Sequence, residues 1–203
     1  DGLALIGDYY APPEAEVGGA PAVLLLHPLS STRRAWAELV PLLSEAGYGV
    51  RAVDMRGHGA ARGSQDWPLA EEDLHLWLEW LRAQDGIDPA RLSIVGASIG
   101  SNLALRGMAG DEAVVTAIAL SPGLNYRGVT TEDALETIDR RPVMLVAGQS
   151  DYESANGVRQ LGLLLKGDSL MRLYATSTHG TAMLADQPTL MPLIVSWLEE
   201  HNR

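Results

Sequence analysis

Residues 95–101 read Val-Gly-Ala-Ser-Ile-Gly-Ser and place one serine, Ser98, between two glycines directly after an apolar run. Glycines at positions 96 and 100 suit a sharp turn from a strand into a helix, because side chains there would collide with neighbouring elements. Such a turn exposes the serine hydroxyl at a helix N-terminus, whose free N–H groups favour negative charge. A chain with 21 glycines also produces this pattern by chance, so the surrounding sequence has to decide whether Ser98 is a nucleophile or an inert serine in a glycine-rich turn.

The segments around this turn alternate between strand-like and helix-like patterns. Short apolar runs typical of buried strands occur at 22–27, 49–53, 92–95, 114–120, 142–147 and 169–174. Apolar residues with helical spacing occur at 36–43, 74–81, 103–108, 158–165 and 190–198. Residues 3–12 alternate as an edge strand or hairpin does. This order predicts an α/β fold with a mostly parallel central sheet of about seven strands and helices on both faces.

Length and composition restrict the class of protein. A chain of 203 residues suits a single domain over 1–203, and no apolar run approaches the roughly 18 residues of a membrane span. The net charge of −11 disfavours nucleic acid as a partner, so we expect a small neutral or cationic molecule. The chain has no cysteine, which excludes disulfides and thiolate metal sites but leaves open both the cytoplasm and export after removal of a signal. Oligomeric state is not predicted.

Two further residues follow predicted strands in the order expected of a catalytic triad. Asp151 lies in "GQSDYES" after the strand at 142–147, and His179 lies in "TSTHGTAM" after the strand at 169–174. Taken singly, the aspartate is typical of a helix N-cap and the histidine of a loop. The order Ser98, Asp151, His179 at the ends of successive strands favours the catalytic interpretation. His179 then accepts the serine proton, and Asp151 orients the imidazole.

An oxyanion hole completes this arrangement. One donor is the N–H of Ile99, the residue after the nucleophile, and the other comes from the loop after the strand that ends near His27. Pro28 has no N–H, so Leu29 is the predicted second donor. We expect His27 to brace this loop.

The remaining titratable candidates have simpler interpretations. Asp54 and His58 in "DMRGHG" could form a second acid and base, while His75 and His201 suit helix surfaces or packing. Glu153 is the alternative acid if Asp151 is misplaced. Residue spacing predicts no metal site, and "GASIGS" lacks the lysine of a phosphate-binding loop, so no cofactor is expected.

Taken in order, these motifs resemble the α/β-hydrolase family, in particular lidless carboxylesterases of the dienelactone-hydrolase-like kind. The resemblance covers almost the whole chain and rests on "LLLHPLSSTRRAW" (24–36), "VDMRGHG" (53–59), "GASIG" (96–100), "LSPGLNYRG" (120–128), "GQSD" (148–151) and "THGTAML" (178–184). It implies an α/β-hydrolase fold and a serine esterase with a nucleophile elbow. It also implies that Asp54 and His58 lie in a structural loop after a strand and are not catalytic. Two positions depart from the family pattern: His27-Pro28 stands where His-Gly is common, and no cysteine can serve as the nucleophile of true dienelactone hydrolases.

The resemblance also predicts the shape of the substrate site. Many α/β-hydrolases insert a helical lid after the sixth strand, but here the interval 122–141 holds about one short helix, near 132–138. We therefore expect no substantial lid and an open cleft for small or medium esters. Its predicted walls are Leu29, Leu124, Tyr126, Tyr152 and Met183.

The same triad also fits a thioesterase, an amidase or a peptidase, because it fixes acyl transfer but not the leaving group. A non-catalytic binding protein on this fold is the alternative from another class.

Overall fold

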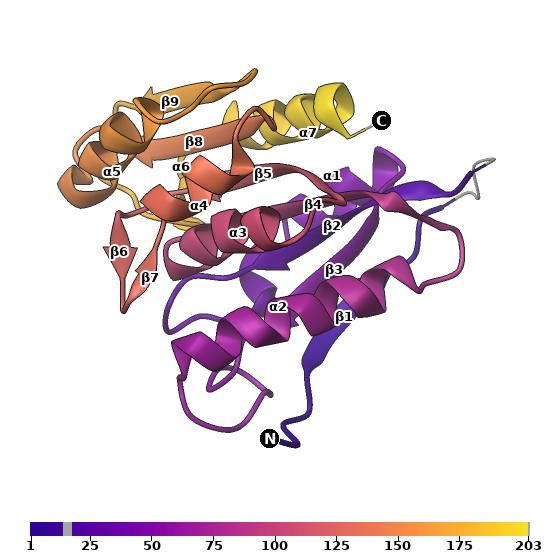
Figure 1. The fold of residues 1–203 in the computed structure, drawn as a ribbon. Helices are drawn as coiled ribbons and strands as arrows, with labels where there is room; N and C mark the ends of the chain where they lie inside the picture. Colours follow the sequence, from indigo (N-terminus) through magenta and orange to yellow (C-terminus); the bar gives the residue numbers. More distant parts are fainter. Residues whose placement is uncertain (14–17, 203) are drawn as a thin grey trace.

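The structure is a computed structural model, and it describes residues 1–13 and 18–202 (Figure 1). Its elements in chain order are β1 (Ile6–Tyr10), β2 (Ala20–Leu26), the 3-10 helix η1 (Arg33–Trp36), α1 (Leu39–Glu45), β3 (Gly49–Asp54), α2 (Trp67–Arg82), β4 (Ile87–Ala97), α3 (Ile99–Gly110), β5 (Val114–Leu120), β6 (Asn125–Tyr126), β7 (Val129–Thr130), α4 (Glu132–Ile138), β8 (Val143–Gly148), α5 (Tyr152–Gly162), β9 (Leu170–Tyr174), α6 (Ala182–Asp186) and α7 (Leu190–His201).

Seven of the strands form one sheet in the order β1-β3-β2-β4-β5-β8-β9. Strand β1 pairs antiparallel with β3 at one edge, and the other pairs are parallel. The predicted mostly parallel sheet is therefore confirmed, with the N-terminal strand at its edge.

The strand register brings the chemistry-bearing loops to one edge of the sheet. Leu26 at the end of β2 lies opposite Gly96 of β4, and Ala97 lies opposite Leu120 at the end of β5. On the far side, Gly148 at the end of β8 lies opposite Tyr174 of β9. When neighbouring parallel strands end in register, the loops that follow them lie side by side. Ligands bind at this edge in such sheets.

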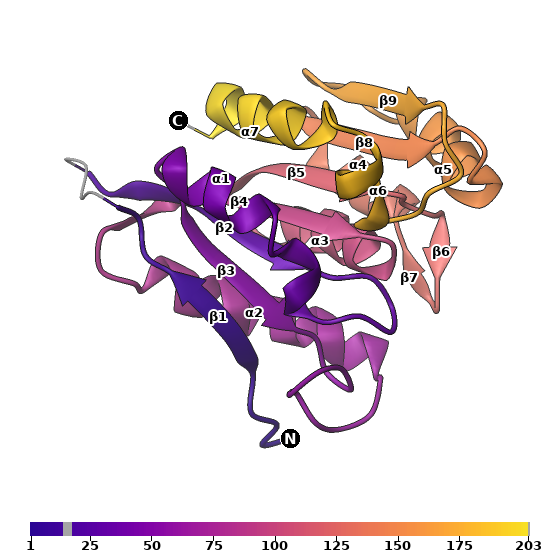
Figure 2. The same ribbon diagram turned by 180° about the vertical axis from the view of Figure 1, so that it is seen from behind.

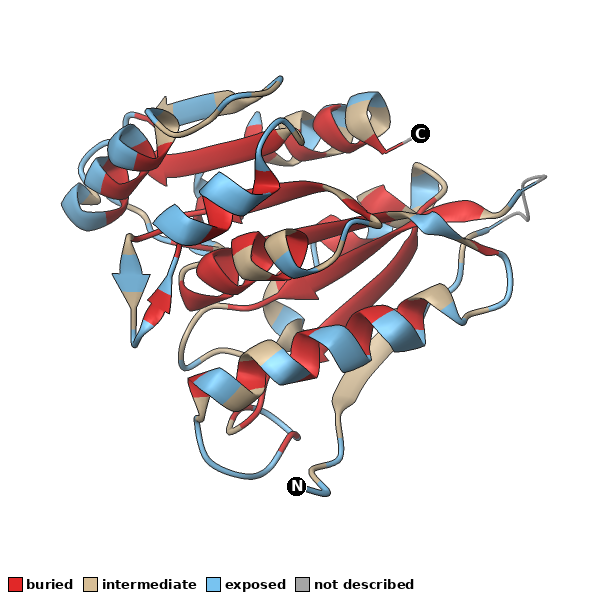
Figure 3. Cartoon of the chain, in the orientation of Figure 1, coloured by how far each residue is buried: buried red, intermediate tan, exposed pale blue. Residues whose placement is uncertain are grey.

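Helices cover both faces of the sheet. Helices α2, α3, α4 and α5 lie on one face (Figure 1), and α1, α6 and α7 lie on the other (Figure 2). Each face carries its own cluster of buried apolar side chains, and all seven residues of β2 are buried (Figure 3). A strand buried on both faces reads as a continuous apolar run, which explains why this strand is visible in the sequence.

Several elements differ from the sequence expectation, among them the short helix α6, which was not predicted. The interval between β5 and β8 contains the expected short helix α4 but also a hairpin of two-residue strands, β6 and β7, that the sequence did not predict. Helix α5 ends at Gly162, so the predicted apolar spacing up to residue 165 runs past the helix, and Leu163 is 85% exposed. No helix in the described part of the chain is long and apolar enough to span a membrane.

Candidate active site

Ser98 occupies a strained turn between β4 and α3. Its φ of 55° and ψ of −124° lie in a region that non-glycine residues rarely adopt, and α3 begins at the next residue. The turn is held by a hydrogen bond of 2.8 Å from the Ser98 N–H to the carbonyl oxygen of Leu120 on β5. Strain of this kind persists only where the surrounding structure enforces it, and it concentrates at functional sites.

Glycine is required on both sides of Ser98. A Cβ on Gly96 would overlap the carbonyl oxygen of Gly100, and a Cβ on Gly100 would overlap the carbonyl oxygen of Leu26 and lie 2.7 Å from that of His27. These obstacles are backbone atoms, which cannot rotate away. The sequence interpretation of residues 95–101 as a tight strand-to-helix turn therefore has a steric basis.

Replacing Gly100 with alanine is expected to destabilise the protein by about 3 kcal/mol or more, because α3 must move away from β2 to admit the methyl group. Thermal or urea unfolding measures this loss. Gly110→Ala is the matched control in the same helix: its Cβ would meet only His75, at 3.4 Å, so stability should be unchanged or slightly improved. Equal stability of the two variants would show that the turn tolerates a side chain.

Asp151 and His179 are brought together directly. His179 Nδ1 lies 2.7 Å from Asp151 Oδ2, so the nitrogen that carries the hydrogen donates to the carboxylate. Asp151 is the N-cap residue of α5, yet its side chain makes no capping hydrogen bond. Its carboxylate is turned to the histidine, which argues against a purely capping role. Glu153 is exposed on the first turn of α5.

The loop that carries His179 packs against the turn that carries Ser98. A Cβ built on Gly180 would lie 3.7 Å from Cβ of Ala97 and 3.3 Å from Cγ of Pro28. Among the described residues the Ser98 hydroxyl makes no hydrogen bond to His179. In unliganded sites this bond is often long and tightens only when substrate binds.

Ser121, which the sequence analysis did not single out, ties these two loops together. It follows β5 with a φ of 54°, is fully buried, and its Oγ accepts a hydrogen bond of 2.9 Å from the N–H of Gly180. The carbonyl oxygen of the preceding residue, Leu120, accepts a hydrogen bond from the N–H of Ser98. One loop therefore fixes the backbone next to both Ser98 and His179.

The two predicted oxyanion donors lie at the ends of β4 and β2. Ile99 is the first residue of α3, so its N–H has no partner one turn earlier in the helix. Leu29 lies in the loop after β2, and its N–H makes no hydrogen bond within residues 1–13 and 18–202. The next residue, Ser30, has a φ of 58°, which bends this loop sharply.

His27 holds the start of the loop after β2. Its Nε2 accepts a hydrogen bond of 3.0 Å from the N–H of Met55, so Nδ1 carries the hydrogen and donates it to the carbonyl oxygen of Pro28 at 2.7 Å. Complete burial lowers the pKa of His27 from 6.5 to about 4. The neutral ring therefore joins the loop to the end of β3, in keeping with the expected bracing role.

This burial predicts a pH dependence of stability. Because the pKa of His27 is lower in the folded than in the unfolded protein, acid favours the unfolded state, and stability present above about pH 6.5 is lost on the way to about pH 4. The loss amounts to at most about 3.5 kcal/mol, from about 2.5 pKa units at 1.36 kcal/mol per unit. Urea unfolding at several pH values measures it. His27→Gln keeps a neutral acceptor but cannot be protonated, so its curve should be flatter; parallel curves would contradict the assignment.

The predicted cleft walls fall into two groups. Leu29, Leu124 and Tyr126 are partly buried against the core beneath α2 to α5, and Tyr152 is 81% exposed beside Asp151. Met183 has no exposed surface and lies in the core on the opposite face. The prediction that Met183 lines the cleft is therefore wrong, because the first turn of α6 directs this side chain into the protein.

The hairpin β6–β7 is clamped to α3 by a buried side chain that the sequence analysis missed. Asn102, one turn after Ser98, donates a hydrogen bond of 2.8 Å to the carbonyl oxygen of Val129 and accepts one of 3.1 Å from the N–H of Gly123. Asn102 is fully buried. The hairpin and its Tyr126 therefore have a fixed position relative to the nucleophile turn.

Ser154 is a further contact of His179 that the sequence analysis did not anticipate. Its Oγ lies 3.3 Å from His179 Nδ1 and 3.2 Å from the hydroxyl of Tyr126. Ser154 is fully buried, and burial raises the pKa of Tyr126, so this hydroxyl stays protonated. The spacing between Asp151 and Ser154 could have indicated this contact. Residues three positions apart lie on the same side of a helix, so Ser154 in the first turn faces the same way as the N-cap residue Asp151.

Asp54 and His58 have the structural roles expected of them. Asp54 accepts hydrogen bonds of 2.8 Å from the N–H groups of Arg33 and Ala60 and also pairs with the Arg33 guanidinium. His58 Nδ1 lies 3.0 Å from the carbonyl oxygen of Arg56. Both side chains hold the loop after β3.

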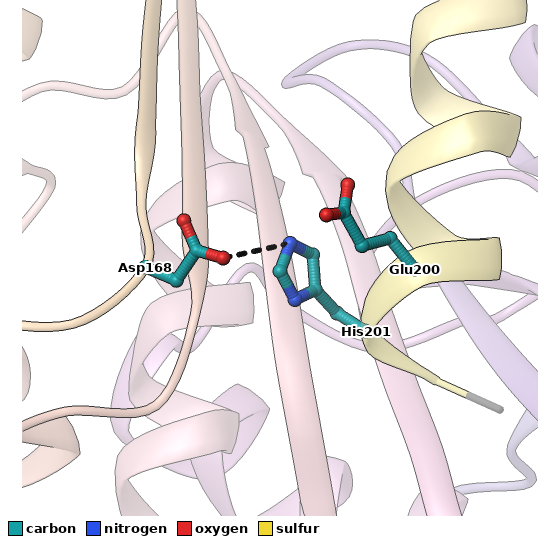
Figure 4. A group of neighbouring side chains, drawn as sticks. All are labelled: Asp168, Glu200 and His201. Carbon is teal, nitrogen blue, oxygen red and sulfur yellow. Dashed lines mark ion pairs between the residues drawn. The ribbon is translucent and has the colours of Figure 1, made fainter.

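A separate group of side chains, Asp168, Glu200 and His201, gathers beside the C-terminal end of α7 (Figure 4). The sequence analysis predicted no such cluster, because Asp168 is far from the other two in the chain. His201 packs on Trp197 with ring centroids 4.0 Å apart, and its Nε2 lies 4.0 Å from Asp168 Oδ2. Packing of the two rings accounts for the position of His201, and its contact with Asp168 is an ion pair only when the imidazole is protonated.

Comparison with known proteins places these features in a family. Residues 23–200 match the model of the alpha/beta hydrolase family. An uncharacterized protein of Mycobacterium tuberculosis strain CDC 1551 is 30% identical in an alignment 168 positions long, which covers 74% of this chain and 59% of that protein. The chain thus spans somewhat more than half the length of this relative.

Solved structures share the fold at low sequence identity. A monoacylglycerol lipase from Paleococcus ferrophilus superposes with a TM-score of 0.81 at 20% identity, covering 98% of this chain and 100% of that one. A dienelactone hydrolase from Anabaena variabilis superposes with a TM-score of 0.80 at 18% identity, covering 98% and 93%. With the family model matching 178 of the 203 residues (23 to 200), the chain belongs to the alpha/beta hydrolase family.

Proposed function

We propose that this protein is a serine hydrolase that cleaves small or medium carboxylic esters through an acyl-enzyme on Ser98. The observation that carries the proposal is the hydrogen bond of 2.7 Å between His179 Nδ1 and Asp151 Oδ2, on a loop packed against the strained turn of Ser98. This bond leaves Nε2 as the basic nitrogen of the imidazole. The names of the structural neighbours, a lipase and a dienelactone hydrolase, are in line with such an activity.

In the acylation step, Ser98 Oγ attacks the ester carbonyl carbon while His179 Nε2 takes the hydroxyl proton. The carbonyl oxygen becomes an oxyanion, which the N–H groups of Leu29 and Ile99 stabilise. The C–O bond to the leaving group then breaks, and His179 returns its proton to the departing alcohol. Asp151 holds the ring and stabilises its charged form throughout.

Deacylation repeats the same steps with water. His179 takes a proton from the water as its oxygen attacks the acyl carbon, and the second tetrahedral intermediate uses the same two N–H donors. Breaking the bond to Ser98 Oγ releases the carboxylic acid and restores the serine proton. No added cofactor or metal takes part in this scheme.

The residues around the triad support a substrate of modest size. Only the hairpin and α4 stand between β5 and β8, so we propose a cleft bordered by Leu29, Leu124, Tyr126 and Tyr152. Partly buried apolar side chains would contact an acyl chain, and the exposed Tyr152 would contact the entering substrate.

A substrate panel tests this proposal. Nitrophenyl esters of increasing acyl length, acyl thioesters and peptide amides are assayed with the wild-type protein and with Ser98→Ala. We expect turnover of the esters, strongest for short and medium chains, and none above background with the variant. Preferred turnover of thioesters or amides would assign one of the other acyl-transfer activities, and a folded protein that hydrolyses none of them would favour a binding function.

A further inference from the structure

The buried hydroxyl of Ser154 gives the base a second hydrogen-bond acceptor beside Asp151. Ser154 is in the first turn of α5, and its Oγ lies 3.3 Å from His179 Nδ1, while Asp151 Oδ2 lies 2.7 Å from the same atom. A histidine Nδ1 carries one hydrogen, so the two oxygens share it. Ser154 must act as an acceptor in this contact.

The Ser154 hydroxyl is also in contact with Tyr126. The two hydroxyl oxygens lie 3.2 Å apart, and either can be the donor, because the serine oxygen has a second lone pair besides the one directed at His179. Tyr126 belongs to the hairpin that Asn102 clamps to α3. The contacts form a chain from a rigid hairpin, through Ser154, to the imidazole.

We propose that Ser154 is a positioning residue for His179, which it holds through a shared Nδ1–H hydrogen bond, while the hydrogen bond to Tyr126 holds the Ser154 hydroxyl in place. This proposal rests on the proposed function of the triad.

The exposure of His179 explains why a second contact matters. The side chain is 42% exposed, whereas that of Asp151 is 14% exposed, so the protein surrounds the ring incompletely. A single hydrogen bond lets a ring turn about its axis, but two acceptors at separate positions, the N-cap residue Asp151 and Ser154 in the first turn of α5, define its plane. The acceptors also stabilise the imidazolium that forms during catalysis, because hydrogen bonds to charged groups are stronger than neutral ones.

Steady-state kinetics of Ser154→Ala test the proposal on the best ester of the panel. Alanine is a better helix former than serine, so α5 should stay intact. We expect kcat to fall roughly 5-fold to 10-fold, the size of one lost hydrogen bond, with KM changed by less than about 2-fold. The rising limb of kcat/KM against pH should move to lower pH, because the charged imidazole loses an acceptor.

The titratable groups around this contact are Asp151 and Glu153 on the α5 side and Tyr126 on the hairpin.

Tyr126→Phe removes only the outer hydroxyl and keeps the ring that borders the cleft. It should lower kcat by a smaller factor, about 2-fold to 3-fold, and shift the pH profile in the same direction. Ser44→Ala, in helix α1, is the matched control and should match the wild type in both measurements.

A double-mutant cycle separates positioning from packing. In an Asp151→Ala background Ser154 is the remaining acceptor for Nδ1–H, so its removal should cost a larger factor than in the wild type. Wild-type kcat and an unshifted pH profile in Ser154→Ala would overturn the positioning role. If Ser98→Ala also retained full turnover, the proposed function itself would fail; if Ser98→Ala were inactive, only the role of Ser154 would be lost.

Discussion

Ser98→Ala should reduce kcat/KM for the best ester substrate by about 10⁴-fold or more, the size expected when a nucleophile is removed from a triad. The remaining residues can polarise an ester but cannot form the acyl-enzyme. The fold should survive, because serine and alanine both carry a Cβ and experience the same strain at a φ of 55°. The glycines that make the turn possible are unchanged.

Thermal unfolding accompanies the kinetic measurement. Equal melting temperatures with a 10⁴-fold loss of activity assign a chemical role to the hydroxyl. Ser44→Ala controls for the effect of removing a serine hydroxyl away from the site. A Ser98→Ala protein that melts normally and retains turnover would exclude Ser98 as the nucleophile.

Asp151→Asn should lower kcat by roughly 10³-fold to 10⁴-fold. The carboxylate accepts the Nδ1–H of His179 at 2.7 Å, and an amide NH₂ group in its place favours the tautomer with hydrogen on Nε2. That tautomer cannot take the proton of Ser98. The loss should appear in kcat more than in KM, because orientation of the base affects the chemical step.

Glu153→Gln is the matched control for this change. It removes the same charge two residues along the chain, from a side chain that is exposed on the first turn of α5. It should retain activity within about 2-fold, since exposed charges contribute little. The reverse pattern, a damaged Glu153→Gln and an active Asp151→Asn, would reassign the acid.

Much of the fold was predictable because the buried strands and the chain order of the site carry their own signals. The apolar run at 114–120 became β5 with the same bounds, and the short helix near 132–138 became α4. Strand β5 is buried at most of its positions, and α4 buries the three apolar residues Ala134, Leu135 and Ile138, so both carry an apolar pattern that the sequence shows. Asp151 and His179 could be placed because each follows such a strand.

Side-chain direction within loops and short elements was not predictable. Met183 follows the histidine by four residues and was expected in the cleft, but the turn of α6 buries it in the opposite core. The strands β6 and β7 have two residues each, too few for any hydrophobic period. Ser121 and Ser154 act through hydrogen bonds to residues 59 and 25 positions away, a distance that a motif does not reveal.

Intact-mass spectrometry after treatment with a fluorophosphonate tests the central claim, that Ser98 is a nucleophile activated by His179. The phosphorus is attacked by an activated serine oxygen, fluoride leaves, and a stable adduct remains. We predict one adduct per chain, mapped to the peptide that contains Ser98, absent from Ser98→Ala and formed far more slowly by His179→Ala. A folded protein that gains no adduct, or that gains it at another residue while Ser98 stays unmodified, would contradict the proposed mechanism.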